Sequence, residues 1–229
     1  MPTILELAEM SNAVYDLTNA PNGWTQVDAK TAPPRSGLQA ATYTQGSETV
    51  IAFRGTVPSQ SGDLQADAML GLGMNCEYFA EAEAYASAHA GDPSKTTLCG
   101  HSLGGAITQI VGNRQSIKFA TFNAPGVALF ASRNIGSSTV TGLAVRTAGA
   151  TLSAVMSPRQ AWRDIRATFN VVNGLNVRLR MDVVSMIGVH YGDIVSLETP
   201  SWSPAEAHGI GTVIGVLRGV GAGTGARSL

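Results

Sequence analysis

The six residues Gly100 to Gly105, Gly-His-Ser-Leu-Gly-Gly, constrain the fold of this chain more than any other stretch. They fit the pattern Gly-x-Ser-x-Gly, in which a serine stands in a sharp turn between a strand and a helix. A β-prone run, residues 95–99, precedes them, and an apolar run, residues 106–111, follows. The flanking glycines relieve crowding around a serine held in a strained turn. The pattern therefore predicts a strand, a turn that exposes the Ser102 hydroxyl, and a buried helix.

The rest of the chain alternates between strand-like and helix-like segments. Strands are expected at residues 38–44, 49–54, 95–99, 117–122, 177–181 and 194–197, and helices at 3–15, 75–89, 157–172 and from 203 onward. Such alternation predicts an α/β fold in which helices cover both faces of a mainly parallel sheet. The tail from Gly215 is expected to fray. Glycines 211, 215 and 219 are spaced four residues apart, which predicts close packing of a helix on the sheet.

Length, charge and cysteine content bound the class of protein. The 229 residues suit one α/β domain, residues 1–229, with a full core. A net charge of −1 gives no electrostatic reason to expect nucleic acid as a partner. The two cysteines are too few for a disulfide framework, and Cys99 is expected in the core. We expect a soluble protein without a signal peptide, cytoplasmic or exported by a signal-independent route.

A serine hydroxyl becomes a nucleophile only when a base takes its proton, and that base is usually a histidine oriented by a carboxylate. In proteins of this architecture the three residues follow the order serine, acid, histidine. Asp182 is the favoured acid because it follows a predicted strand, and Asp193 is its rival. His190 and His208 both follow Ser102 and Asp182, so chain order leaves both open as the base.

Two further considerations concern the base and the oxyanion. His208 is expected in the first turn of the helix that begins near Ser203, where the helix N-terminus would keep the imidazole neutral. His101 is set aside because adjacent residues at a sharp turn point in different directions. The backbone N–H of Leu103 is expected to stabilise an oxyanion, with Thr56, which follows Gly55 at an earlier strand end, as the second donor. We expect neither a cofactor nor a metal ion.

Five segments together resemble the class 3 lipases, the group that contains the fungal triacylglycerol lipases. The similar segments are residues 50–56, 63–67, 100–105, 119–125 and 180–184. The resemblance implies an α/β-hydrolase-like fold, Ser102 as nucleophile, Asp182 as acid, His208 as base and Thr56 as an oxyanion donor. It also implies a lid at about residues 58–74.

The chain departs from the family's pattern in three places. The segment between Asp182 and His208 is short, the proline-rich run after the acid is absent, and residues 127–174 are longer, which suggests a cap or insertion there. The leading interpretation is a serine ester hydrolase of the lipase or esterase kind, acting on an ester or lipid substrate at a membrane or micelle surface. The alternatives are a phospholipase or thioesterase, including a bacterial lipase effector delivered into another cell, and a non-catalytic binding module on the same fold.

Overall fold

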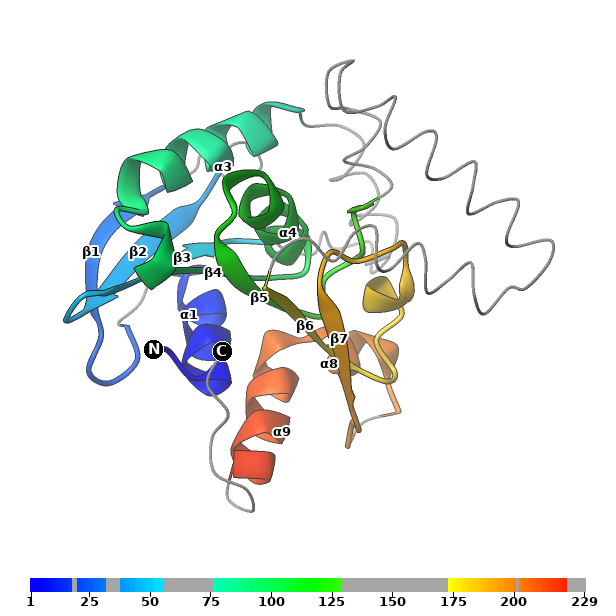
Figure 1. Cartoon of the computed structure of the whole chain (residues 1–229). Coiled ribbons are helices and arrows are strands. Elements are labelled where there is room, and N and C mark those ends of the chain that lie inside the picture. The colour runs from blue at the N-terminus through cyan, green and yellow to red at the C-terminus, as the bar shows by residue number, and fades with distance from the viewer. Residues whose placement is uncertain (18–19, 32–37, 56–75, 129–172, 201, 222–229) are drawn as a thin grey trace.

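A mixed sheet of seven strands forms the centre of the protein (Figure 1). The computed structural model describes residues 1–17, 20–31, 38–55, 76–128, 173–200 and 202–221. The strands lie side by side in chain order: β1 (Thr25–Lys30), β2 (Ala40–Gln45), β3 (Glu48–Phe53), β4 (Thr96–His101), β5 (Lys118–Phe122), β6 (Gly174–Leu179) and β7 (Asp193–Leu197). Strands β1 to β3 pair antiparallel, and β3 to β7 pair parallel. The predicted α/β fold with a mainly parallel sheet is confirmed.

Helices cover both faces of the sheet. Helices α1 (Ile4–Ala13) and α9 (Ile210–Gly221) lie on one face, and α3 (Cys76–His89) and α4 (Leu103–Gln115) lie on the other (Figure 1). Strand β3 contributes side chains to the cores on both faces of the sheet. Its side chains alternate, so that Ile51 and Phe53 join the core beneath α3 and α4, while Val50 and Ala52 join the core beneath α1 and α9.

Local signals set the ends of the first helix and the hairpin as expected. Thr3 caps α1, and its side chain and that of Glu6 each bind the other's backbone N–H. Strands β2 and β3 are joined by the two residues 46 and 47, and Gly46 has a positive φ of 59°. A two-residue turn of this kind matches the right-handed twist of the paired strands.

The C-terminal helix differs from the prediction in two ways. Helix α9 continues to Gly221 instead of fraying from Gly215. The expected close packing at glycines 211, 215 and 219 is also wrong, because a Cβ at any of them would meet nothing within 4 Å. These glycines share an outward face, whereas Val213 and Ile214 on the opposite side are buried in the core that α9 shares with α1. Apolar contacts, not small residues, hold this helix in place.

The first strand was missed by the sequence analysis. β1 is one of the two edge strands of the sheet, and all of its side chains are exposed or half-buried. Its one strongly apolar residue, Val27, lies in an irregularity of the register and is 55% exposed. An edge strand that buries little has no apolar alternation to reveal it.

Several predicted features lie outside the described residues. They are Thr56, the lid at 58–74, the first residue of the helix expected at 75–89, and most of the segment at 127–174, including the helix at 157–172. The short elements are within the described ranges: the 3-10 helices η1 (Pro93–Lys95) and η2 (Val184–Met186), and the one-turn helix α8 (Pro204–His208). Because β3 to β7 are parallel, Gly55, Ser102, Asn123 and Asp182 all follow strand ends at one edge of the sheet. That edge carries the candidate site.

Candidate active site

Ser102 occupies the turn between strand β4 and helix α4. Its backbone has φ 56° and ψ −127°, a conformation that residues with a side chain rarely adopt. The turn is fixed on both sides: the Ser102 N–H donates to the Phe122 carbonyl at 3.1 Å, and the Ser102 carbonyl accepts from the Ala106 N–H at 3.1 Å. The strained turn that the sequence predicts is therefore present, held by strand β5 and by the first turn of α4.

Glycines around this turn allow backbone segments to approach one another. A Cβ at Gly100 would lie 2.5 Å from the backbone carbon and oxygen of Gly104, and a Cβ at Gly104 would overlap the carbonyl oxygen of Phe53. A Cβ at Gly55 would lie 2.5 Å from the His101 carbonyl oxygen and 3.2 Å from the Ser102 Cβ. The end of strand β3 therefore lies directly beside the serine, as expected of the segment that leads into Thr56.

The structure brings Ser102, His208 and Asp182 together in a hydrogen-bonded chain. The Ser102 Oγ lies 2.9 Å from His208 Nε2, and His208 Nδ1 lies 2.8 Å from Asp182 Oδ1. All three side chains are buried. Since a carboxylate only accepts, Nδ1 donates to Asp182, and in the neutral ring Nε2 is left to accept from the serine hydroxyl. This is the orientation in which an imidazole can remove the serine proton.

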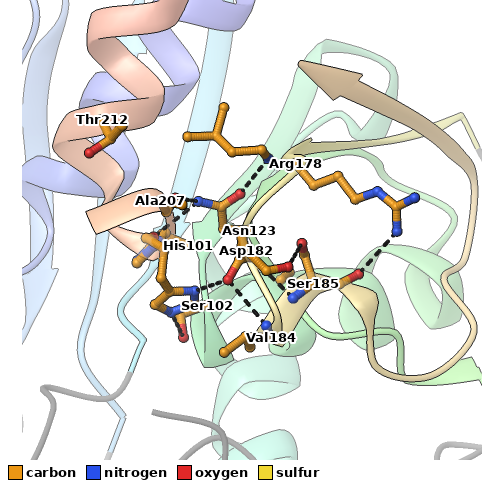
Figure 2. Close-up of polar contacts among 12 residues, drawn as sticks. His101, Ser102, Asn123, Arg178, Asp182, Val184, Ser185, Ala207 and Thr212 are labelled. Carbon is orange, nitrogen blue, oxygen red and sulfur yellow. Dashed lines mark hydrogen bonds and ion pairs between the residues drawn. The ribbon is translucent and has the colours of Figure 1, made fainter. Parts of the chain in front are cut away.

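Backbone amides hold the Asp182 carboxylate in place (Figure 2). Oδ1 also accepts from the Val184 N–H at 3.2 Å, and Oδ2 accepts from the Ser185 N–H at 3.1 Å. The Ser185 hydroxyl donates back to the Asp182 carbonyl at 3.1 Å. The Asp182 carboxylate thus accepts from the first two backbone N–H groups of the short helix η2 while it faces His208. The residue is fully buried, and three donors satisfy its two oxygens.

The two alternatives that chain order left open, His190 and Asp193, make other contacts. His190 is buried, and its Nε2 donates to the Ala124 carbonyl at 2.8 Å. Burial lowers the pKa of His190. Asp193 is exposed at the start of β7, at the opposite end of the strand from the site edge. Neither residue belongs to the chain of hydrogen bonds at Ser102.

The expected helical position of His208 is wrong. His208 is the last residue of the one-turn helix α8, and a new helix, α9, begins at Ile210. The expected effect of a helix N-terminus therefore does not apply to His208. Its place follows instead from the short turn at Ser203, whose side chain accepts from the Glu206 N–H, and from contacts on its own backbone.

Two residues that support His208 were missed. Asn123 follows strand β5, has a φ of 48°, and donates through Nδ2 to the carbonyls of Ala207 at 2.7 Å and His208 at 3.0 Å. Its Oδ1 accepts from the Leu179 N–H at 2.9 Å. His101 Nε2 also donates to the His208 carbonyl, at 2.7 Å. A polar residue directly after a buried strand at the site edge was the available signal for Asn123.

One of the two predicted oxyanion donors can be placed. Leu103 is the first residue of α4, so its N–H belongs to the first turn, where backbone donors have no partner within the helix. Its partner in the prediction, Thr56, lies outside the described residues, although Gly55 before it lies beside Ser102.

The family of the chain follows from its sequence. The statistical model of the Tle-like phospholipase domain, in the group described as phospholipase-like, matches residues 6–198. The chain belongs to this family. The match spans the described sheet and includes Ser102 and Asp182, and it confirms the lipase-like kinship and the ester hydrolase activity that the sequence predicted. No curated protein matched the chain.

Solved structures of lipases and of an esterase match this chain at low sequence identity. A mutant form of MDLA from Penicillium cyclopium is 14% identical, with a TM-score of 0.44, over 87% of this chain and 78% of that one. A fungal lipase is 15% identical, with a TM-score of 0.48, over 91% and 80% of the two chains. The carboxylesterase EstE1, cloned from a metagenomic library, is 13% identical, with a TM-score of 0.34, over 94% and 91%.

None of the described helices has the length and apolar character of a membrane span. The same part of the chain contains no group of three or more His, Cys, Asp or Glu side chains placed to hold a metal ion.

Proposed function

We propose that this protein is a phospholipase that cleaves the carboxylic ester bond of a phospholipid through an acyl-enzyme on Ser102. The observation that carries the proposal is the buried hydrogen-bonded chain from the Ser102 hydroxyl through His208 to Asp182. The phospholipase-like family favours a phospholipid over the triacylglycerol or simple ester that the motif alone would equally suit. The complete chain of polar residues argues against a binding module that kept only the fold.

The geometry suits the usual two-step acyl transfer. His208 Nε2 takes the proton of Ser102 as Oγ attacks the ester carbonyl, and Asp182 stabilises the imidazolium that forms. The Leu103 N–H, aided by Thr56, stabilises the oxyanion of the tetrahedral intermediate. The imidazolium then protonates the leaving alcohol, which here is a lysophospholipid. Water attacks the acyl-enzyme with His208 again as base, which releases the fatty acid and restores Ser102.

Exposed apolar side chains near the site support an encounter with a lipid surface. Val183 and Met186 follow Asp182 and are 41% and 55% exposed. Trp202, six residues before His208, is 88% exposed. All three follow the carboxyl ends of β6 or β7, at the edge that carries Ser102. Tryptophan favours the interface between lipid and water because its ring is apolar and its N–H is polar.

Covalent labelling tests the proposal most directly. A fluorophosphonate should modify Ser102 in the wild-type protein, with the modified peptide identified by mass spectrometry. Ser102→Ala should abolish both labelling and the release of fatty acid from phosphatidylcholine vesicles, with a loss of about 10⁴-fold or more. His208→Ala should lose as much, because the two residues act as one unit.

The matched control is the other histidine that chain order allowed. His190→Ala should keep most of the activity, because His190 contacts the Ala124 carbonyl and not Ser102. Reversed phenotypes of the two histidine variants would refute the assignment of the base. Release of fatty acid from a thioester or a triacylglycerol, but not from phosphatidylcholine, would refute the substrate class while leaving the mechanism intact.

A further inference from the structure

The backbone carbonyl of His208 is held by two side chains from neighbouring strand ends. His101 Nε2 lies 2.7 Å from this oxygen, and Asn123 Nδ2 lies 3.0 Å from it. His101 is the last residue of β4 and Asn123 follows β5, so both reach across the site edge to the end of α8, which carries His208. Both donors are buried. The imidazole of His208 is therefore positioned through its own main chain as well as through Asp182.

The protonation of His101 follows from its two contacts. A carbonyl oxygen only accepts, so Nε2 carries the proton. Burial, and next the nearby His208, lower the pKa of His101 to about 3, so the ring is neutral at physiological pH. A neutral ring with its proton on Nε2 accepts at Nδ1. The Tyr15 hydroxyl, 2.9 Å from Nδ1, must therefore be the donor in that contact.

Tyr15 connects this arrangement to the end of strand β3. Its hydroxyl accepts a hydrogen bond from the Gly55 N–H, and burial raises the pKa of Tyr15, which keeps the phenol protonated. Its own carbonyl accepts from the Gln39 side chain at 3.0 Å, which fixes the residue just after α1. The route from Gly55 to His208 thus has one consistent direction of donation at every contact.

We propose that Tyr15 and His101 form a neutral hydrogen-bond relay that positions the general base His208 and couples it to Gly55, the residue before the predicted oxyanion donor Thr56. The inference rests on the proposed function of Ser102 and His208. Both relay members are positioning residues: the His101 imidazole contacts the His208 carbonyl and not the Ser102 hydroxyl. The relay connects the base to the segment that is predicted to stabilise the oxyanion. These two parts of the site must be correctly placed relative to each other. The relay also explains why a second histidine beside the serine need not act as a second base.

Substitutions at His101 can separate the two ring nitrogens. Glutamine places an amide N–H near the position of Nε2 and can still donate to the His208 carbonyl, whereas asparagine reaches only the position of Nδ1. His101→Asn should lower kcat on phosphatidylcholine by about 10- to 100-fold with little change in KM, because misplacement of a catalytic group by about 1 Å costs up to about 10²-fold. His101→Gln should restore most of that loss. Asn123 still donates to the carbonyl in both variants, which limits the cost in stability.

A second variant and a spectroscopic measurement test the other half of the relay. Tyr15→Phe removes the donor to Nδ1 and the acceptor of the Gly55 N–H, and should lower kcat within the same range. Combined with His101→Asn it should add little further loss, because both substitutions break one unit. Nitrogen-15 spectra of wild-type protein labelled at histidine should show His101 with a protonated Nε2 and an unprotonated Nδ1 between about pH 5 and pH 8. In Tyr15→Phe the Nδ1 resonance should shift.

His89 supplies the control, since it lies at the end of α3 and contacts Asp28 and Tyr85. His89→Asn should leave kcat unchanged. Equal activity of His101→Asn and His101→Gln, or a His101 ring that titrates in this pH range, would overturn the relay. Failure of the relay and failure of the proposed function give different results. If the proposed function fails, the wild-type protein is not labelled at Ser102 at all. If only the relay fails, labelling and turnover of the wild-type protein stay intact.

Discussion

Burial of His101 should make the folded protein sensitive to acid. The pKa of His101 is about 3 in the folded protein, whereas a solvated histidine titrates near 6.5. Below about pH 6.5, His101 therefore binds a proton in the unfolded chain but not in the folded protein. The stabilisation associated with the neutral ring is complete above that pH and is lost as the pH falls toward 3. The His190 pKa is also lowered, so it contributes in the same direction.

The size of the effect follows from the shift. A group that is protonated only in the unfolded state lowers the free energy of unfolding by about 1.4 kcal/mol per pH unit. Between about pH 6 and pH 4, His101 alone should then remove about 2–3 kcal/mol, a large share of the about 5–15 kcal/mol that stabilises a typical domain. Carboxylates with lowered pKa values, such as Glu6, add a loss of the same sign, so the informative quantity is a difference between variants.

Urea unfolding of wild type and His101→Gln across this pH range measures that difference. Glutamine does not titrate, so the variant should lose less stability on acidification, by about 2–3 kcal/mol between pH 6 and pH 4. Far-UV circular dichroism can follow unfolding, together with fluorescence of Trp24, which is buried and donates to Glu6 at 3.0 Å. Equal pH dependence of the two proteins would refute the reasoning, because it would mean that His101 takes up its proton without unfolding the chain.

Two further outcomes follow from the site geometry. Asp182→Asn should lower kcat by about 10³-fold while far-UV circular dichroism stays unchanged. The reason is that a unit charge about 4 Å from the imidazolium stabilises it by about 4 kcal/mol at an effective dielectric constant of 20. A loss below tenfold would contradict the role of the carboxylate. Trp202→Ser should lower the fraction of protein that sediments with phosphatidylcholine vesicles and slow hydrolysis of the vesicle lipid. Turnover of a short-chain, monomeric p-nitrophenyl ester should stay unchanged. An equal loss on both substrates would show that Trp202 does not act at the lipid surface.

The sequence determined the elements whose signals are local. The capping box of Thr3 and Glu6, the alternation in residues 49–54 and the glycines around Ser102 each act within a few residues, so helix α1, strand β3 and the strained turn were predictable. The position of Asp182 at the site edge was predictable because strand order places the end of a late strand there. Strand β1 was not, because its single strongly apolar residue, Val27, is exposed and no apolar alternation marks the strand.

Only the tertiary structure decided which histidine faces the serine and what holds it there. His208 is 106 positions from Ser102 and His101 is 107 positions from His208, and no local pattern encodes a contact across such distances. Parallel strands bring their carboxyl ends to one edge, and that shared edge lets His101 and Asn123 meet one backbone carbonyl. As a residue type, His190 could serve as a base equally well. The fold instead places its imidazole against the Ala124 carbonyl and not against Ser102. Residue types and their order determined which groups could react, whereas the packing of strand ends determined which of them meet, because hydrogen bonds require atoms to lie within about 3 Å.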